Sequence, residues 1–306
     1  KTRTFTTWQA GRMADAANLP PLVCGSCGQV AAVTELRWRC GCGGVFDVAE
    51  AWRSPMPVDP SISMGEGGTP IVRSRSLPRV QLKLEFLSPT LSFKDRGAVV
   101  LASLAARIGV RQAVVDSSGN AGTAAAAYFA RAGVGCRVFV PASTSPAKLA
   151  QIRAHGADVT VVAGSRADTA AAAVAVVAEQ PDVFYASHVY HPYFLHGVKT
   201  YGYEIWEQHG RTLPSAVMVP VGNGTLLLGC HLAFTELVAA GLADRLPALL
   251  AVQAANCAPL ADAWRRGAAV VAPVTARATV AEGIAIAAPP RAAQILAAVR
   301  ASGGTI

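Results

Sequence analysis

The feature that most constrains the fold is a repeated alternation of short apolar strands and helices in the middle of the chain. The pattern predicts strands at 112–116, 136–140, 158–162 and 183–185, with helices at 123–131, 146–155 and 166–179. Such alternation is typical of a parallel sheet covered by helices on both faces. We therefore expect an α/β fold that binds its ligands at the carboxyl ends of the strands.

Composition and charge narrow the class of protein further. Of the 306 residues, 52% are hydrophobic and 15% are charged, which predicts a large buried core rather than disorder. The net charge of +8 is scattered and forms no Lys/Arg block, so we expect no nucleic-acid partner. No apolar run reaches the roughly 18 residues that a membrane span needs, so we expect no membrane partner. An odd number of cysteines, seven, favours a reducing cytoplasm over a disulfide scaffold.

The segment Ser92-Phe-Lys94-Asp-Arg-Gly97 carries the most reactive side chain. It lies between a strand-like run at 81–86 and an apolar helical run at 98–104, so Lys94 is expected at a loop-to-helix junction. A helix N-terminus carries partial positive charge, which favours the neighbouring Asp95 and disfavours a lysine. The plain interpretation is a solvated lysine in a first helical turn. The chemical one is an amine of lowered pKa that forms a Schiff base.

This segment resembles the cofactor-binding lysine motif of threonine synthases, which are pyridoxal-phosphate (PLP) enzymes of the tryptophan-synthase-β fold type. Gly65-Glu-Gly-Gly-Thr-Pro70 is similar to another segment of that family. The resemblance implies a two-domain α/β PLP fold of type II, with a small α/β domain at 88–198. The larger PLP-binding domain would comprise 51–87 and 199–306, with its C-terminal end beyond the last residue given. The resemblance further implies that Lys94 is catalytic and carries PLP, and that the enzyme is a homodimer.

Two glycine-containing turns each follow a predicted strand and precede a helix, where backbone N–H groups are suited to anions. In the first, the resemblance implies that Asn120 contacts the phenolic oxygen of PLP. Its neighbours would bind the substrate carboxylate: Ser117, Ser118 and Gly119. The second would hold the PLP phosphate through Gly222, Asn223, Gly224 and Thr225. The plainer alternatives are a helix N-cap for the first turn and a nucleotide site for the second, although the second matches no nucleotide motif. Glu282 and Gly283 resemble a loop near the cofactor ring.

The segment 188–200 resembles the family pattern N-S-x-N-P-Y-R-x-x-G-x-K-T. Lys199 matches the pattern and is a candidate for substrate binding, as is His188, which stands where the family has asparagine. Phe194 replaces the arginine that would hold a substrate phosphate, and an aromatic ring cannot make bidentate contacts to phosphate. The histidines at 188, 191 and 196 either bind a different leaving group or, more plainly, cap helices or face solvent.

Two close cysteine pairs near the N-terminus, at 20–50, resemble a zinc ribbon. The pairs are Cys24 with Cys27, and Cys40 with Cys42. Four thiolates bind Zn²⁺ tetrahedrally, and glycines allow the tight turns around them. The ion would be structural, because four protein ligands close the site to catalysis. The second pair is C-x-C instead of the usual C-x-x-C, so a ribbon that retains the fold without binding metal is the alternative.

The resemblance predicts a PLP-dependent lyase that acts at the β or γ carbon of a small amino-acid substrate. Conversion of O-phosphohomoserine to threonine is the first hypothesis. The alternative is another PLP-dependent lyase or replacement enzyme, threonine/serine dehydratase-like or cysteate-synthase-like, which the replacement of arginine by Phe194 favours. A third hypothesis is a protein that binds the cofactor without being active.

Overall fold

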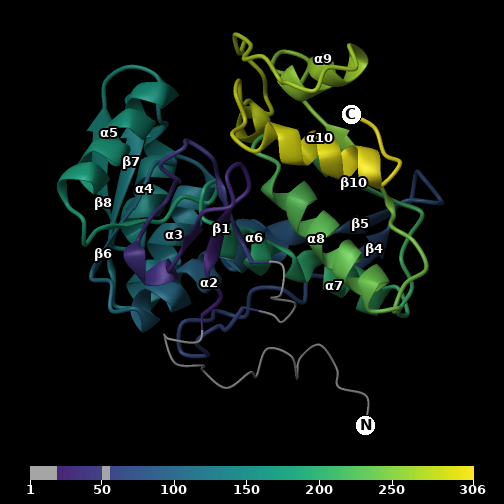
Figure 1. Ribbon diagram of the computed structural model, residues 1–306, viewed down its shortest axis with the longest axis horizontal. Coiled ribbons are helices and arrows are strands. Elements are labelled where there is room, and N and C mark those ends of the chain that lie inside the picture. Colours follow the sequence, from purple (N-terminus) through teal and green to yellow (C-terminus); the bar gives the residue numbers. More distant parts are fainter. Residues whose placement is uncertain (1–18, 50–55) are drawn as a thin grey trace. The chain divides into compact units, whose positions relative to one another are not determined.

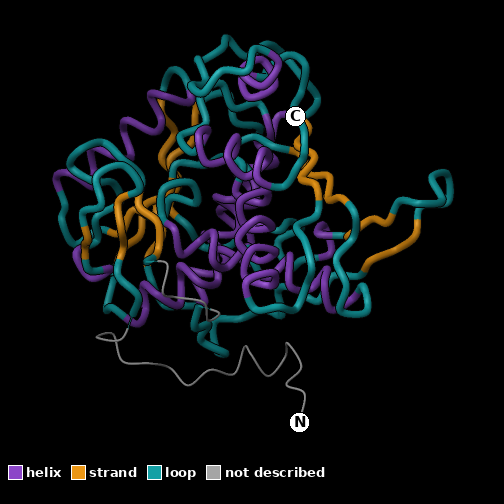
Figure 2. The backbone as a smooth tube through the Cα atoms, turned by 45° about the vertical axis from the view of Figure 1, so that its right-hand side comes forward, coloured by secondary structure: helices purple, strands orange, loops and turns teal. Residues whose placement is uncertain are grey.

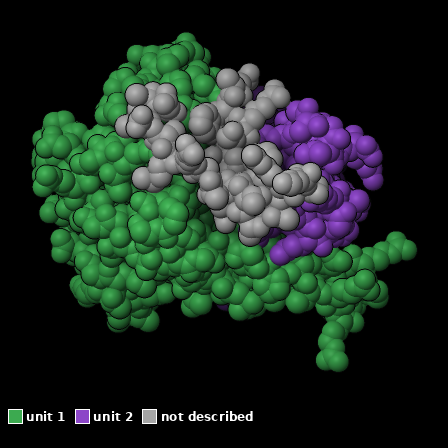
Figure 3. Space-filling model, turned by 90° about the horizontal axis from the view of Figure 1, so that it is seen from below, with its two compact units in different colours: residues 1–197 green, residues 198–306 purple. Residues whose placement is uncertain are grey.

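The computed structural model describes residues 19–49 and 56–306 (Figure 1). The chain divides into two compact units, which are residues 1–197 and 198–306 (Figure 3). The predicted small domain, 88–198, remains a prediction. The grouping of 51–87 with 199–306 in a larger domain remains a prediction, and its residues 51–55 lie outside the described part of the chain.

Unit 1 contains the predicted parallel sheet, whose strands are orange in Figure 2. Its strand order is β8-β7-β6-β9, and every neighbouring pair is parallel. The strands are β6 (Gln112–Val115), β7 (Gly135–Pro141), β8 (Asp158–Val162) and β9 (Phe184–Tyr185). The predicted α/β core is confirmed, with strand ends within one residue of those expected.

The helices between the strands lie on both faces of this sheet. Helices α3 (Asn120–Arg131) and α4 (Pro146–Ala154) accompany the steps from β6 to β7 and from β7 to β8. Helix α5 (Arg166–Glu179) returns from β8 to β9 in the opposite direction. Because parallel crossovers are right-handed, α5 covers the other face. The strand order thus reverses at the β6–β9 pair, and ligands in such sheets bind outside the carboxyl ends of strands at a reversal of this kind.

Helix α2 (Lys94–Arg107) precedes the sheet and packs on α3. Nearly all of α2 is buried, from Asp95 to Ala105. Helix α3 contributes four consecutive buried alanines, Ala124–Ala127. Small side chains allow close approach of the two helices, so the backbone at the start of α2 is held firmly. This packing positions Lys94.

The rest of unit 1 consists of small elements that flank the parallel sheet. Strands β1 (Leu22–Cys24), β2 (Val30–Ala31) and β3 (Phe46–Val48) form an antiparallel sheet in the order β2-β1-β3, with η2 (Val33–Glu35) after β2. Strands β4 (Ile71–Arg73) and β5 (Gln81–Lys83) form an antiparallel hairpin that is followed by η3 (Glu85–Leu87). The strand predicted at 81–86 is therefore shorter than expected. Helix α6 (Pro192–Val198) ends at the boundary between the units.

Unit 2 is built around two parallel strands, β10 (Ala216–Pro220) and β11 (Ala248–Val252). Helix α8 (Thr225–Ala239) follows β10 and packs against α7 (Thr200–Gln208) and α10 (Ala292–Ala301). The unit also contains α9 (Pro259–Arg265) and η4 (Glu282–Ile284). Within the described ranges, no helix combines the length and the apolar character that crossing a membrane requires.

Candidate active site

Lys94 is the first residue of α2, as the sequence predicts, and the residues after it fix that helix end. Asp95 is buried and its carboxylate accepts hydrogen bonds from the backbone N–H of Thr90, at 2.7 Å, and from the Thr90 hydroxyl. Burial raises the pKa of Asp95 to about 6 in spite of these hydrogen bonds. The turn that precedes Lys94 is thereby closed onto the first turn of α2.

Arg96 anchors the same helix end to the η3 turn through a buried ion pair. Its guanidinium donates to both carboxylate oxygens of Glu85, at 2.7 and 2.8 Å, and its side chain is 1% exposed. The Thr69 hydroxyl donates to Glu85 at 2.6 Å. Sequence reasoning missed this pair, because nothing local to either residue indicates which partner it has. Thr69 lies in the Gly65–Pro70 segment, so the contact joins two segments that share the family resemblance.

Gly97 completes the motif by making room for Phe194. A Cβ atom at Gly97 would lie 2.5 Å from three carbons of the Phe194 ring, so only glycine fits. Gly197 is equally constrained, because a Cβ there would lie 2.2 Å from the backbone oxygen of Arg96. Helix α6 therefore packs closely on the first turn of α2. Consequently Phe194, the residue that departs from the family pattern, lies beside Lys94.

The amine of Lys94 lies in an aromatic environment. Its Nζ is 4.3 Å from the ring centroid of Phe93 and 5.8 Å from that of Phe194. Burial, with a smaller contribution from the positive charge of Arg166, lowers the pKa of Lys94 to about 7. The amine is therefore substantially uncharged near neutral pH, which is the state that attacks an aldehyde.

The buried His188 lies beside Phe194 and near Lys94. Its ring is edge-to-face with Phe194, with 5.8 Å between the centroids. Burial, reinforced by the positive charges of Lys94 and Arg166, holds the pKa of His188 well below its usual value. His188 is thus a neutral imidazole near Lys94, and neither it nor Phe194 adds positive charge there. The structure places His188 in the site region, and its contact with substrate remains a prediction.

The loop predicted to bind substrate carboxylate follows β6 at the carboxyl edge of the sheet. Ser117 is buried, whereas Asn120 is exposed at the first helical position of α3. The N-cap is Gly119 and no side chain caps the helix, so this loop begins α3 through a glycine, as the plain alternative supposed. A Cβ at Gly122 would lie 1.9 Å from the Ser117 carbonyl oxygen, so this tight turn requires glycine at position 122.

The second predicted loop lies in unit 2 at the start of α8. Gly224 is the N-cap with φ 76°, and a Cβ there would lie 2.3 Å from Ile295 Cδ1. A Cβ at Gly222 would meet the backbone of η4, 3.0 Å from Ile284 Cα. Unit 2 thus brings together the loop predicted for phosphate and the segment that contains Glu282. The backbone N–H groups at the start of a fifteen-residue helix are suited to an anion.

Lys199 lies in unit 2 and is fully buried. Its amine donates to both carboxylate oxygens of Glu236, at 3.0 and 3.2 Å, and the Tyr203 hydroxyl donates to the same carboxylate. Burial lowers the pKa of Lys199, although the Glu236 charge opposes that shift. An internal ion pair therefore engages this amine, and its role in substrate binding remains a prediction.

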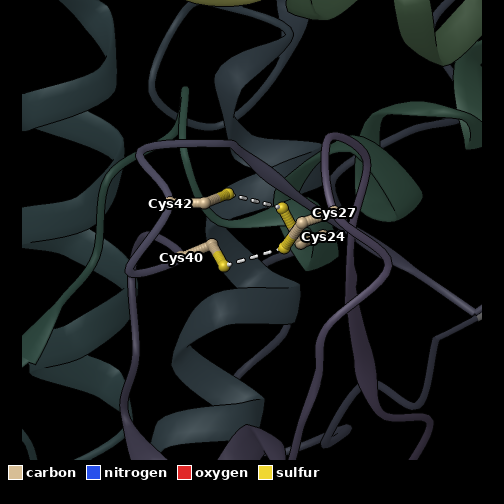
Figure 4. A group of neighbouring side chains, drawn as sticks. All are labelled: Cys24, Cys27, Cys40 and Cys42. Carbon is tan, nitrogen blue, oxygen red and sulfur yellow. Dashed lines mark hydrogen bonds between the residues drawn. The ribbon is translucent and has the colours of Figure 1, made fainter.

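The four N-terminal cysteines come together at one end of the β1–β3 sheet, with their sulfur atoms facing one another (Figure 4). The Cys24–Cys42 and Cys27–Cys40 sulfur distances are both 3.6 Å, and all four atoms lie within 4.8 Å of one another. Tetrahedral Zn²⁺ with sulfur at about 2.3 Å requires sulfur separations of about 3.8 Å. A Cβ at Gly44 would lie 2.6 Å from Cys24 Sγ, so this glycine permits the approach.

Comparison with known proteins connects these two units to one family. Residues 62–306 match the family model for pyridoxal-phosphate dependent enzymes. The chain is 32% identical over 314 residues to the threonine synthase of Methanosarcina acetivorans, covering 93% of this chain and 77% of that protein. It is 33% identical to the threonine synthase of Methanocaldococcus jannaschii, covering 92% of this chain and 77% of that protein.

Solved structures with the same fold include amino-acid deaminases. A bacterial threonine deaminase, from T.th., aligns with a TM-score of 0.63 and 27% identity, covering 78% of this chain and 76% of that one. A fungal L-serine ammonia-lyase from Rhizomucor miehei aligns with a TM-score of 0.65 over 78% of this chain and 74% of that one. At 21% identity, the second likeness concerns the fold alone.

Proposed function

Because the chain belongs to the threonine synthase family of pyridoxal-phosphate-dependent enzymes, we propose that it converts O-phosphohomoserine and water to threonine and phosphate, with phosphate leaving the γ carbon and water adding at the β carbon. The observation that carries the proposal is the amine of Lys94, which lies at a helix start, 4.3 Å from the ring centroid of Phe93 and 5.8 Å from that of Phe194, with its pKa lowered by burial to about 7. A PLP-dependent enzyme of this family needs such an amine to hold the cofactor. The chain is accordingly a PLP-dependent lyase.

Each unit, taken by itself, contains residues that suit one group of the cofactor. In unit 1, an amine whose pKa burial lowers to about 7 is partly uncharged near neutral pH and can bond covalently to an aldehyde. In unit 2, Gly222 and Gly224 pack closely against neighbouring residues at the start of α8. The first backbone N–H groups of this helix are suited to a phosphate. When bound, PLP supplies an electron sink for a carbanion at the substrate Cα.

The protein's own groups then have separate tasks. Lys94 would hold the cofactor through its amine and would move a proton at the substrate Cα. The backbone N–H groups of 117–119 would orient the substrate carboxylate, and Asn120 would help to hold the cofactor through its amide. The buried ring of Phe194 excludes water beside the amine. These assignments rest on the family resemblance together with the positions of the residues at the carboxyl edge of the sheet.

A second candidate reaction is supported by what surrounds Lys94. Phe194 has no hydrogen-bond donor for a phosphate, and His188 is uncharged at neutral pH. A substrate with a smaller or uncharged leaving group would fit this environment without an arginine. The reaction would then be a dehydratase-like elimination from threonine or serine, or a cysteate-synthase-like replacement.

The two candidates are separated by assaying one preparation on each substrate. Phosphate release from O-phosphohomoserine, with threonine as product, is expected under the first proposal. Keto-acid formation from threonine or serine, with no phosphate release, would favour the second. Phe194→Arg provides the matched variant, because a restored guanidinium should raise the ratio of the first activity to the second.

The covalent attachment of PLP should depend on pH near neutrality. A lysine whose pKa is lowered to about 7 is protonated and unreactive below that value, and becomes reactive as the pH rises through it. An exposed lysine would show the same rise only near its ordinary pKa of about 10.4. Borohydride trapping of PLP on the protein, measured between pH 5 and 10, should therefore give a midpoint near 7. A midpoint above about 9 would contradict the buried amine.

A structural zinc ion at the four cysteines is the next part of the proposal. The sulfur separations of 3.6 Å are close to the spacing that tetrahedral Zn²⁺ requires, and two backbone N–H groups point at sulfur. We expect one zinc per chain by elemental analysis, reduced to well below one in a Cys24→Ser, Cys27→Ser variant. Wild-type protein grown with zinc and found free of it would refute this part.

The family resemblance also carries two broader proposals. One is a homodimer, for which sedimentation of the purified protein is the test. The other is residence in the reducing cytoplasm, which is supported by the fact that all seven cysteines, each within the described residues, are thiols outside any disulfide.

A further inference from the structure

Aromatic contacts join the four-cysteine segment, residues 20–48, to the carboxyl end of the parallel sheet. Trp38 lies two residues before Cys40, and its ring contacts two tyrosines edge to face. The ring centroids are 5.2 Å apart for Tyr185 and 4.9 Å apart for Tyr190. Trp38 also packs on the core cluster that contains Tyr185. The indole thus contacts the stretch of chain that leads from β9 to α6.

Each of these tyrosines is connected to a part of the candidate site. Tyr185 is buried, and its hydroxyl donates to Asp116 Oδ1 at 2.8 Å. Asp116 directly precedes the 117–120 loop. Tyr190 follows the buried His188 by two residues. A shift of the two tyrosine rings would therefore act on both sides of the substrate region.

A second set of contacts connects the same stretch of chain to the four-cysteine segment. The buried Tyr193 donates its hydroxyl to the carbonyl oxygen of Pro20 at 2.9 Å. The guanidinium of Arg39 lies 5.9 Å from the ring centroid of Tyr190. The residues 185–193 thus contact the chain just before the first cysteine pair and just before the second.

The four-cysteine segment has little core of its own to hold Trp38 in place. Its three strands contain three, two and three residues. Units this small are usually ordered by a metal or a crosslink, so metal binding at their ligands is coupled to folding. Loss of the ion would loosen the loop that carries Trp38.

We propose that the four-cysteine segment, acting through Trp38, positions the substrate side of the Lys94 site. Trp38 is a positioning residue, and metal loss at the cysteines is transmitted to 112–120 and 183–194. The kinetic consequence rests on the proposed function, because it assigns 117–119 and His188 to the substrate. The structural consequence does not depend on which substrate is used.

Hydrogen–deuterium exchange of the full-length, PLP-loaded protein tests the structural consequence. Trp38→Ala should speed exchange roughly tenfold in peptides from 112–120 and 183–194, because two edge-to-face aromatic pairs are lost. Trp38→Phe keeps a ring there and should stay within roughly threefold of wild type. Trp264→Ala is the matched control, since it removes a half-buried indole that contacts Arg300 in unit 2.

Chelation of wild-type protein with EDTA provides the second arm and needs no substitution. It should speed exchange in the same two groups of peptides, with reversal when Zn²⁺ is added back. In Trp38→Ala, chelation should still speed exchange within 22–48. It should add little to the exchange at 183–194, because the connecting contact is already absent. The kinetic readout is a KM raised roughly tenfold in Trp38→Ala, with kcat changed less than roughly threefold.

Two results would overturn the proposal. One is exchange that rises only within 22–48 on chelation, with 183–194 unchanged. The other is a Trp38→Ala protein that matches Trp264→Ala in exchange and in KM. Failure of the proposed function is recognised separately, because the wild type would then release no phosphate from O-phosphohomoserine, whatever the exchange pattern.

Discussion

Replacing Lys94 with alanine should abolish covalent attachment of PLP and reduce turnover by at least roughly a thousandfold. The size of the effect follows from two tasks, since one amine both holds the cofactor and moves the substrate proton. The visible absorbance of the protein-bound cofactor should disappear with the activity. Purified variant and wild type are compared by absorbance spectrum and by product formation.

Two further variants make this comparison specific. Lys94→Arg retains a positive charge but cannot bond to an aldehyde, so it should lose the absorbance and the turnover as alanine does. Lys148→Ala removes a half-buried lysine from α4 and should retain both. Turnover that survives in Lys94→Ala would refute the assignment of this residue.

Replacing Glu85 with alanine should lower the free energy of unfolding by about 3 kcal/mol. The substitution leaves the guanidinium of Arg96, whose side chain is 1% exposed, without the carboxylate that it contacts at 2.7 and 2.8 Å. A buried charge that loses its partner is costly, whereas the intact pair adds little net stability. Urea denaturation of the full-length protein measures the loss.

An exposed ion pair supplies the control for this experiment. Asp262 and Arg265 are 2.9 Å apart on α9, with side chains 40% and 66% exposed. Asp262→Ala should therefore cost less than about 1 kcal/mol. Glu85→Gln, which keeps one acceptor oxygen and loses the charge, should fall between the two. Equal losses in Glu85→Ala and Asp262→Ala would show that the buried pair does not hold the start of α2.

The central sheet could be predicted because local sequence determines it. The predicted strand 158–162 and helix 166–179 coincide with β8 and α5. Ser165 and Asp168 explain the agreement at the helix start, because each side chain bonds to the backbone N–H of the other. The position of Lys94 at a helix start was predictable from the apolar helical run that follows it, although no side chain caps that helix.

Contacts between distant residues could not be predicted in this way. The strand expected to reach residue 86 ends at Lys83, and Glu85 lies instead in a turn where it meets Arg96. The contact between Trp38 and Tyr185 joins residues far apart in the chain, and neither residue has a neighbouring motif that indicates it. The family resemblance identified the reactive lysine. The side chains that surround and position it could be identified only from the structure.

Phe194 illustrates the difference between what its sequence position indicates and what the structure adds. The sequence indicates only that Phe194 stands where the family pattern has an arginine. In the structure it is a buried ring against Gly97, 5.8 Å from the amine whose pKa is about 7. That position makes the replacement a change in the site itself, and it is the reason that both candidate substrates need to be assayed.

The central claim is that Lys94 is the residue to which the cofactor is bonded, and peptide mapping tests it most directly. Wild-type protein is loaded with PLP, reduced with borohydride, digested and analysed by mass spectrometry. The predicted result is one pyridoxyl group per chain on the peptide that contains Lys94, with the peptides of Lys83, Lys148 and Lys199 unmodified. A pyridoxyl group on another lysine, or on none, would contradict the account.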